Sequence, residues 1–364
     1  MVLTLRRLNR TLLQRQHLLE RSTTLSALQM VGHLLAMQSQ EPNWPYIGLW
    51  TRLANFTHAD LTALLDDRMV VRSTMIRTTQ HLATAELFAT LRPVVQPALD
   101  RTARARYFTD QTTDLNLAEL LQAGRELLTG RTLTRRQYGT LLAERFPGRK
   151  ASILAAAVEL RTPIVHPNPG GTWGGWGTRP GMPVALAEDW LGRPLDGTPR
   201  TDEVITRYLA AFGPATVKDI QSWSGLTRLC ETVERLDLRI LHDEQGKQFV
   251  DLPGAPLADP DLPAPVRFLP AFDNLLLGHA DRTRIISDAA RKVVMPGGAM
   301  VLPTFLIDGF VHGTWSAKGK NLRLTPLKPL PDKAASALLE EAERLRPFIG
   351  AETLTLDREP APSS

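Results

Sequence analysis

The clearest pattern of apolar and polar positions spans residues 200–254. Apolar residues recur at helical spacing up to Phe212, and Gly213-Pro214 ends this helix. Thr216 is then placed to cap a short second helix, which breaks at Ser224-Gly225. A third helix and two alternating strands around a polar turn follow. The predicted helices are 204–212, 217–223 and 226–236, and the predicted strands are 238–242 and 248–252. Three helices followed by a hairpin is the order of a winged-helix unit.

The same order recurs in two other parts of the chain. At 132–182, Thr134 is placed to cap a helix that Pro147-Gly148 ends, and residues 1–92 carry a looser copy. For 132–182 the predicted elements are helices at 135–146 and 150–160 and strands at 164–166 and 172–176. For 1–92 they are helices near 5–19, 25–37 and 58–67 and a hairpin at 69–82. We therefore predict three tandem winged-helix units, with a helical connector at 93–131.

The C-terminal part of the chain has a different character. Residues 264–326 contain short apolar segments interrupted by Pro and Gly, with a hairpin turn at Asp308-Gly309, and they predict a small β-barrel or sheet. An amphipathic terminal helix is predicted at 331–347 and a disordered tail at 358–364. The predicted fold class is therefore α+β.

The charge is distributed unevenly along the chain. Residues 1–150 hold 20 Lys/Arg against 12 Asp/Glu, whereas the remainder holds 23 against 26. Of the 43 basic residues only 8 are lysines, and the planar guanidinium of arginine suits phosphate pairing better than an ammonium group does. A compositional bias toward arginine explains that preference equally well, but it explains the asymmetry less well. The basic first half favours a nucleic-acid partner.

Composition also limits the class of protein. With 43% hydrophobic and 22% charged residues, the chain is typical of a soluble protein with real cores. No segment reaches the roughly 20 apolar residues that span a bilayer, and Met1–Arg10 lacks the apolar run of a signal peptide, so we expect a cytoplasmic protein. The single cysteine, Cys230, is expected to be a buried structural thiol, and metal or redox chemistry receives little support.

Candidate DNA contacts cluster in the predicted hairpins. The first hairpin, 72–81, is dense in phosphate-seeking and groove-reading side chains and contains no acid, whereas a solvated hairpin face normally shows both charges. The second contains glycine-spaced tryptophans, for which core packing and stacking on DNA are both open. A predicted hairpin of the C-terminal sheet supplies weaker candidates. The predicted DNA-binding residues are Arg72, Arg77, Thr78, Gln80, His81, Trp173, Trp176, Arg179, Arg291 and Lys292.

Gln38 and Gln40 follow an apolar helix and precede a Pro-rich turn at 41–45. In an extended exit from the helix their two amides would share one face. Alone, this Gln-x-Gln signal is weak, because glutamines at a helix end are usually solvated or capping.

Four segments together resemble one known family. They are 36–42, which reads Ala-Met-Gln-Ser-Gln-Glu-Pro, the hairpin 72–82, the segment 269–282 and the segment 311–315. In this order they are similar to the AlkZ family of bacterial DNA glycosylases, across nearly the whole chain. The resemblance implies three winged-helix units in a basic channel, a C-terminal β-barrel, and removal of N7-alkylated guanines, including those in interstrand cross-links. The family's catalytic motif is two glutamines around an aliphatic residue, which a sister branch replaces with Gln-x-Asp. This chain resembles the Gln-x-Gln branch and departs from it at Ser39, whose side chain should point away from the substrate.

The resemblance implies that Gln38 and Gln40 are catalytic, and the chemistry is reasonable. Glutamine does not titrate, but an N7-alkylguanine already carries a positive charge and leaves without being protonated. Amide carbonyls suffice to stabilise an oxocarbenium-like sugar and to hold a water molecule. Glu41 is a possible auxiliary residue, as a base or an electrostatic stabiliser.

Two other interpretations stay open at this stage. A non-catalytic winged-helix regulator is the alternative function, although such proteins normally supply a second half-site by dimerisation. Asp273, His279 and Asp281 suggest a metal site, but their spacing matches no metal motif and turn residues explain them better. We expect no metal, no nucleotide cofactor, a monomer, and as partner double-stranded DNA carrying alkylated or cross-linked guanine in the bacterial nucleoid.

Overall fold

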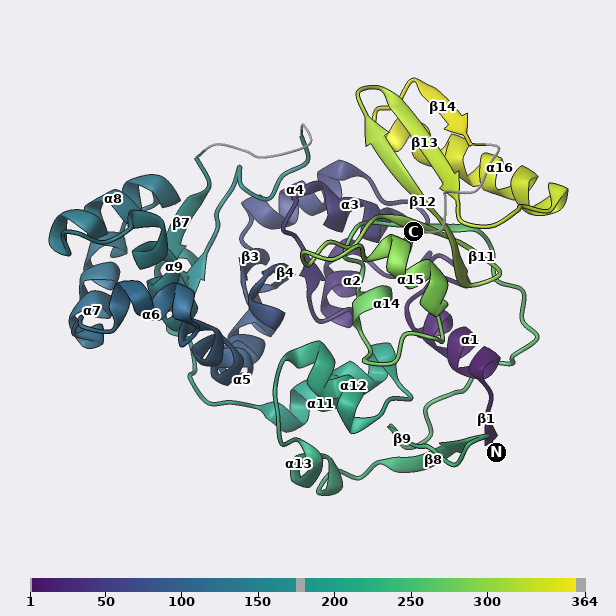
Figure 1. Cartoon of the computed structure of the whole chain (residues 1–364), viewed down its shortest axis with the longest axis horizontal. Coiled ribbons are helices and arrows are strands. Elements are labelled where there is room, and N and C mark those ends of the chain that lie inside the picture. Colours follow the sequence, from purple (N-terminus) through teal and green to yellow (C-terminus); the bar gives the residue numbers. More distant parts are fainter. Residues whose placement is uncertain (1, 175–180, 358–364) are drawn as a thin grey trace.

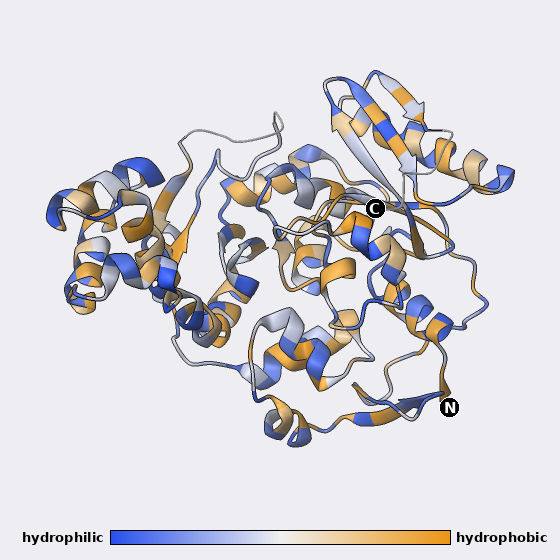
Figure 2. Ribbon diagram, in the orientation of Figure 1, coloured by the Kyte–Doolittle hydropathy of each residue, from blue (hydrophilic) through white to orange (hydrophobic). Residues whose placement is uncertain are grey.

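The computed structural model describes residues 2–174 and 181–357 and shows a mixed α+β fold. In Figure 1, strands β3 and β4 lie near the centre, between a helical lobe of α6–α9 and a C-terminal sheet with helix α16. Polar and apolar residues alternate along the helices in Figure 2, as expected for helices with one buried face.

The N-terminal region contains four helices and three strands. The helices are α1 (Leu5–Arg15), α2 (Ala27–His33), α3 (Asn43–Trp50) and α4 (His58–Asp66), and the strands are β2 (Met37–Gln38), β3 (Val70–Thr74) and β4 (Gln80–Thr84). The first two helices end earlier than predicted, and α3 replaces the predicted turn at 41–45. Pro45 is compatible with α3 because it lies in the first turn, where backbone N–H groups have no partner within the helix.

The next region is mainly helical and also supplies strands to the central sheet. Its helices are α5 (Ala85–Ala103), α6 (Arg106–Thr112), α7 (Leu117–Leu128), α8 (Arg135–Arg145), α9 (Ala151–Arg161) and α10 (Ala187–Leu191), and its strands are β5 (Leu133–Thr134), β6 (Ile164–Val165) and β7 (Pro183–Leu186). Thr134 caps α8 as predicted. The predicted return strand at 172–176 is wrong for residues 172–174, which form no strand, and β7 pairs with β6 instead.

Six strands from these two regions form one sheet in the order β2-β4-β3-β6-β7-β5. The two predicted hairpins are joined where Ser73 of β3 pairs with Val165 of β6. Buried Glu159 on α9 supports this junction. Its carboxylate accepts a hydrogen bond from the Thr74 hydroxyl and contacts Nε2 of His166 at 3.1 Å. The sheet therefore depends on contacts between segments about 90 residues apart.

The third predicted unit shows the expected order of elements. Its helices are α11 (Thr201–Phe212), α12 (Val217–Ser224) and α13 (Cys230–Glu234), and its strands are β8 (Arg239–Asp243) and β9 (Gln248–Asp251). Thr216 caps α12, and Gly225 ends it with φ of +76°. The helix predicted at 226–236 shrinks to α13, on which Cys230 is exposed rather than buried. Strand β1 (Val2–Leu3), which the sequence did not predict, pairs in parallel with β8.

The C-terminal region forms an open sheet in the order β10-β11-β12-β13-β14. Its strands are β10 (Arg267–Leu269), β11 (Thr304–Ile307), β12 (Phe310–Lys318), β13 (Asn321–Pro326) and β14 (Thr353–Leu356), and its helices are α14 (Asn274–Leu277), α15 (Asp288–Val294) and α16 (Asp332–Phe348). Within the described residues β10 and β14 do not pair, so no closed barrel forms. The turn at Asp308-Gly309 is confirmed, with positive φ at both residues. The predicted tail 358–364 lies outside the described residues, and the division into three winged-helix units stays a prediction.

Candidate active site

The first glutamine of the Gln-x-Gln motif ends strand β2, and the second lies two residues beyond it. Leu35, with φ of +62°, ends the preceding helical segment and turns the chain into extended backbone. In the antiparallel β2–β4 pair, Gln38 lies opposite His81, and the N–H of Ser39 donates to the carbonyl of Gln80 at 2.8 Å. Alternation from β2 into Ser39 places the side chains of Gln38 and Ser39 on opposite faces, and Gln40 lies in a bend just beyond the strand. Ser39 is only 1% exposed, and the prediction that its side chain points away from the substrate stays a prediction.

The two glutamines differ in their access to solvent. Gln38 is 8% exposed and lines a narrow hollow, whereas Gln40 is exposed at the surface. Oε1 of Gln40 accepts a long hydrogen bond of 3.4 Å from the N–H of Gln80. The hollow has a volume of about 10 Å³, which is roughly the room that one water molecule needs. The nearly buried amide of Gln38 thus lies beside a water-sized space, and the exposed Gln40 follows two residues later along the chain.

The segment before α14 forms the opposite wall of this hollow and holds β2 in place. Nδ2 of Asn274 donates a hydrogen bond to the carbonyl of Ala36. Asp273 forms a buried bidentate ion pair with Arg52 at 2.7 and 2.9 Å and also accepts from the N–H of Leu275. Phe272 lies between these contacts with φ of +60°, a strained conformation for a side chain of this size. Sequence reasoning used this segment as a family signature and considered Asp273 for a metal site, but it missed the position of the segment beside Gln38.

Two residues predicted to contact DNA are instead buried. Arg72 is 4% exposed, and its guanidinium donates to the carbonyls of Ser39 at 2.9 Å, Gln40 at 3.3 Å and Gly170 at 2.9 Å. His81 is 0% exposed. The predicted direct contact with DNA is therefore wrong for Arg72 and His81, because β3 and β4 pair inside the sheet and bury both side chains. Arg72 fixes the backbone of the glutamine segment.

The tip of the same hairpin retains some access to solvent. Arg77, Thr78 and Gln80 are half-buried, and Arg77 and Thr78 have φ of +51° and +60°. Nη1 of Arg77 donates to the carbonyl of Trp223 at 3.1 Å. Burial, together with the smaller effect of the charge of Arg282, lowers the pKa of Arg77 to about 10. DNA contact by these three residues stays a prediction.

Trp173 belongs to an aromatic cluster. Its ring stacks on His58 with centroids 4.2 Å apart and packs against Tyr46 and Phe348 at 5.6 Å each. Packing occupies this half-buried ring, so its assignment as a DNA-binding residue is not supported. Trp176 and Arg179 lie outside the described residues, so their predicted contacts stay predictions.

The structure also shows where the weaker DNA-binding candidates lie and what the residues considered for a metal site contact. Arg291 and Lys292 are exposed, but they lie on α15 and not in the predicted hairpin. Asp273, His279 and Asp281 each bind elsewhere: Asp273 to Arg52, His279 to the carbonyl of Phe212 at 3.0 Å, and Asp281 to Nζ of Lys247 at 3.0 Å. No group of three metal-binding side chains occurs in residues 2–174 and 181–357. Glu41, the possible auxiliary residue, is half-buried shortly before α3.

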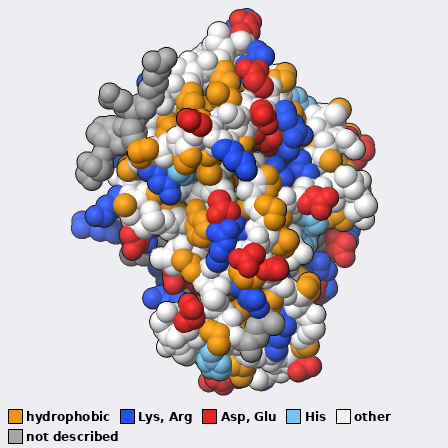
Figure 3. Space-filling view, turned by 90° about the vertical axis from the view of Figure 1, so that its right-hand side faces the viewer, with side chains coloured by type: hydrophobic (Ala, Val, Ile, Leu, Met, Phe, Trp, Pro, Cys, Tyr) orange, Lys and Arg blue, Asp and Glu red, His pale blue; other side chains and the backbone are white. Residues whose placement is uncertain are grey.

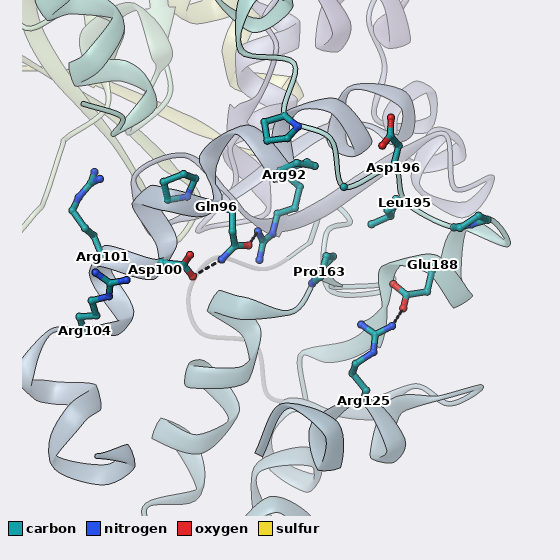
Figure 4. Close-up of a pocket in the computed structure, with 15 residues that line it drawn as sticks. Arg92, Gln96, Asp100, Arg101, Arg104, Arg125, Pro163, Glu188, Leu195 and Asp196 are labelled. Atoms are coloured by element: carbon teal, nitrogen blue, oxygen red, sulfur yellow. Dashed lines mark hydrogen bonds and ion pairs between the residues drawn. The ribbon is translucent and has the colours of Figure 1, made fainter. Parts of the chain in front are cut away.

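A wide hollow in the described part of the chain is separate from the glutamines. It has a volume of about 900 Å³ and lies between α5 and the segment 194–199. Figure 4 shows Arg92, Gln96 and Asp100 on one side and Leu195 and Asp196 on the other, with the pair of Arg125 and Glu188 at the rim. None of its lining residues lines the hollow beside Gln38.

Comparison with known proteins defines the class of this molecule. The sequence matches the family described as "DNA glycosylase AlkZ-like" over residues 31–348, and the chain belongs to this family. The resemblance seen in the sequence motifs is thereby confirmed.

One curated relative and one solved structure are similar over nearly their whole length. The relative is the interstrand DNA cross-link repair glycosylase of Streptomyces sahachiroi, 24% identical over 369 residues, which cover 94% of this chain and 95% of that protein. The structure is the Streptomyces sahachiroi DNA glycosylase AlkZ, with a TM-score of 0.78, 23% identity, and coverage of 98% of this chain and 100% of that one. The structural likeness shows the shared fold. Within the described residues, no helix is long and apolar enough to cross a membrane.

Proposed function

We propose that this protein hydrolyses the N-glycosidic bond of N7-alkylguanine in DNA, unhooks N7-linked interstrand cross-links of the kind formed by azinomycin-like agents, and leaves abasic sites. Membership of the AlkZ-like glycosylases supports the reaction class. The name of the Streptomyces relative, a cross-link repair glycosylase, supports the cross-linked substrate. The observation that carries the catalytic assignment is the nearly buried amide of Gln38 beside a space for about one water molecule, with the exposed Gln40 two residues further along the chain.

The reaction needs no titrating side chain for its first step. As the bond between C1′ and N9 breaks, its electron pair moves to N9 and neutralises the positive charge of the alkylated ring. The sugar becomes an oxocarbenium-like cation, and the oxygen of a water molecule adds to C1′ and releases its proton to solvent. Gln38 and Gln40 supply carbonyl dipoles that stabilise the cation and acceptors that aim the water. A normal guanine lacks the pre-formed charge, so the same two amides do not suffice to remove it.

The size of the site favours attack on a base that stays in the duplex. Enzymes that extrude a nucleotide hold the extruded base in a fitted pocket. The hollow at Gln38 has room for about one water molecule. A cross-linked guanine is tied to the opposite strand and resists extrusion, so a site that brings water to the lesion suits this substrate.

The face shown in Figure 3 carries charges of both signs. On that face Lys/Arg and Asp/Glu side chains are interspersed with apolar ones. Binding to duplex DNA relies on the neutralisation of several phosphates by neighbouring cations. We place the DNA on the side of the hairpin tip, near Arg77, Thr78 and Gln80, with Arg291 and Lys292 as further contacts.

Single-turnover excision from a duplex containing one N7-methylguanine tests the proposal. Gln38→Ala and Gln40→Ala are expected to slow excision by about 100-fold or more, since each removes a preorganised dipole. Gln245→Ala, at an exposed turn of the β8–β9 hairpin, is the matched control and should excise normally. Strand breakage after alkali reports the abasic product, and a second duplex with an N7-linked cross-link reports unhooking.

Two results would overturn the proposal. Wild-type rates in both variants would remove the catalytic assignment. Tight binding of damaged duplex without release of any purine would leave a winged-helix binding protein of the regulator type.

A further inference from the structure

His81 lies beside Gln38, and the proposed reaction leaves its chemistry unused. The two residues are direct partners in the antiparallel β2–β4 pair. Their side chains therefore leave the same face of the sheet, with Cβ atoms about 4.5–5.5 Å apart. His81 is fully buried, and Gln38 is nearly so. At this separation the imidazole of one residue is within reach of the amide of the other.

The surroundings of His81 fix which nitrogen carries its proton. Nδ1 lies 2.9 Å from the carbonyl oxygen of Thr79, which can only accept, so Nδ1 carries the hydrogen and donates it. Burial lowers the pKa of the imidazole to about 3, with a further lowering by the charge of Arg77, so the ring is neutral at pH 7. Nε2 is then a bare acceptor, and it is buried with no hydrogen-bond partner among the described residues. Leaving such an acceptor unsatisfied is unfavourable, because it loses the hydrogen bond that it would make to water.

The orientation of the Gln38 amide matters for the proposed chemistry. An amide presents a carbonyl oxygen and an NH₂ group of nearly equal size at its two ends. Only the oxygen stabilises an oxocarbenium-like cation or accepts a hydrogen from the attacking water. The NH₂ group, turned toward the sugar, would place partial positive charge beside the cation. A neighbour that only accepts hydrogen bonds would remove this ambiguity by attracting the NH₂ end.

We infer that His81 is a positioning residue for the glycosylase: the amide of Gln38, which does not reach Nε2 in the orientation described here, turns its NH₂ group onto this free acceptor in solution, so that Oε1 of Gln38 faces the lesion. This inference rests on the proposed function of Gln38. It gives a use to the unsatisfied nitrogen of a histidine that the sequence had suggested as a DNA contact. His81 acts only through Gln38 and does not touch the substrate.

Arg77 is the rival donor for the same nitrogen. Nη2 of Arg77 is also buried without a partner among the described residues, and its charge influences His81. If Nε2 accepted from Arg77, the imidazole would hold the hairpin tip and would not orient Gln38. Gln38→Ala and Arg77→Met therefore separate the two interpretations.

The test combines kinetics with ¹⁵N NMR of histidine-labelled full-length protein. His81→Phe keeps a ring but removes the acceptor, and it is expected to slow single-turnover excision of N7-methylguanine by about 10- to 100-fold. Affinity for the damaged duplex should stay within about twofold of wild type, and His81→Gln, with a carbonyl acceptor, should recover part of the rate. His279→Phe is the matched control, because His279 is equally buried, its pKa is also lowered to about 3, and its Nδ1 has no partner among the described residues. This control should excise at the wild-type rate.

In the NMR experiment, the ¹⁵N chemical shift of His81 Nε2 at pH 7 should be that of a nitrogen without a hydrogen, which accepts a hydrogen bond. This chemical shift should change in Gln38→Ala and should not change in Arg77→Met. Any of three results overturns the inference. His81→Phe excises at the wild-type rate, or His279→Phe is slowed as much as His81→Phe. The third is an Nε2 resonance of His81 that moves only in Arg77→Met. A wild-type rate in Gln38→Ala would instead overturn the proposed function, and the NMR comparison would still judge the contact between His81 and Gln38.

Discussion

The ion pair between Arg52 and Asp273 offers the sharpest test of how the candidate site is held together. Their side chains are 0% and 3% exposed. The guanidinium of Arg52 also donates to the carbonyl of Gly48 at 2.9 Å and to Oε1 of Gln16 at 3.2 Å. Asp273 caps α14 and precedes Asn274, which donates to the carbonyl of Ala36. Asp273→Ala therefore affects both stability and the position of β2.

The expected loss of stability follows from the burial of the pair. Removing one partner leaves an uncompensated buried charge, which costs about 3–5 kcal/mol, and loss of the helix cap adds about 1 kcal/mol. With an unfolding entropy of about 2.1 cal/mol/K per residue, 4 kcal/mol corresponds to a fall in melting temperature of roughly 5 °C for a cooperative unit of 364 residues. The double variant Arg52→Met with Asp273→Leu removes both charges and should recover most of this loss.

Differential scanning calorimetry and single-turnover excision measure the two consequences. Glu352→Gln breaks the exposed pair with Lys320 and should change stability by no more than about 1 kcal/mol, which makes it the control. Asp273→Ala should also slow excision, because the wall opposite Gln38 loses its anchor. A melting temperature within 1 °C of wild type would refute the argument that this pair secures the segment.

The remaining predictions concern four single positions. Arg72→Met should slow excision more than it weakens DNA binding, because Arg72 is buried and holds the backbone of the glutamine segment. Fluorescence anisotropy measures the DNA binding. A loss of affinity at an unchanged excision rate would contradict this prediction. Burial raises the pKa of Glu159, but the neighbouring His166 and Arg135 and the Thr74 hydroxyl outweigh it and lower that pKa to about 2. Ionised Glu159 therefore stabilises the folded state at pH values above the ordinary carboxyl pKa. This stabilisation is lost as the pH falls from about 4.5 toward 2. Glu159→Gln should therefore flatten the dependence of melting temperature on pH in that window. Trp173→Ala should lower stability by about 3 kcal/mol without changing affinity for DNA, since its ring packs on His58. The excision rate should be nearly independent of pH between 5.5 and 8.5 in wild type and in Glu41→Gln. A rate that falls at low pH in wild type but not in Glu41→Gln would assign catalysis to the Glu41 carboxylate.

Much of the local structure could be predicted because it depends on neighbouring residues. Thr134 and Thr216 cap the helices that follow them, and Asp308-Gly309 forms the turn that its residue types favour. The local pattern also indicated that the chain leaves its helix near Gln38, but it left open whether the exit is extended, and the structure shows strand β2 there. For these features the decisive interactions lie within a few residues along the chain.

Only the tertiary structure decided which side chains are buried and which strands pair. The residues of the hairpin 72–81 look like a DNA-contacting surface, yet β6 joins β3 and β2 joins β4, so Arg72 and His81 lie inside. Strand β6 also pairs with β7, which follows it by about 20 residues. Strand β8 pairs with β1 from the start of the chain. The wall opposite Gln38 comes from residues more than 230 positions away. Such pairings depend on which distant surface completes the burial of an apolar face, and this information is absent from any local window of the sequence.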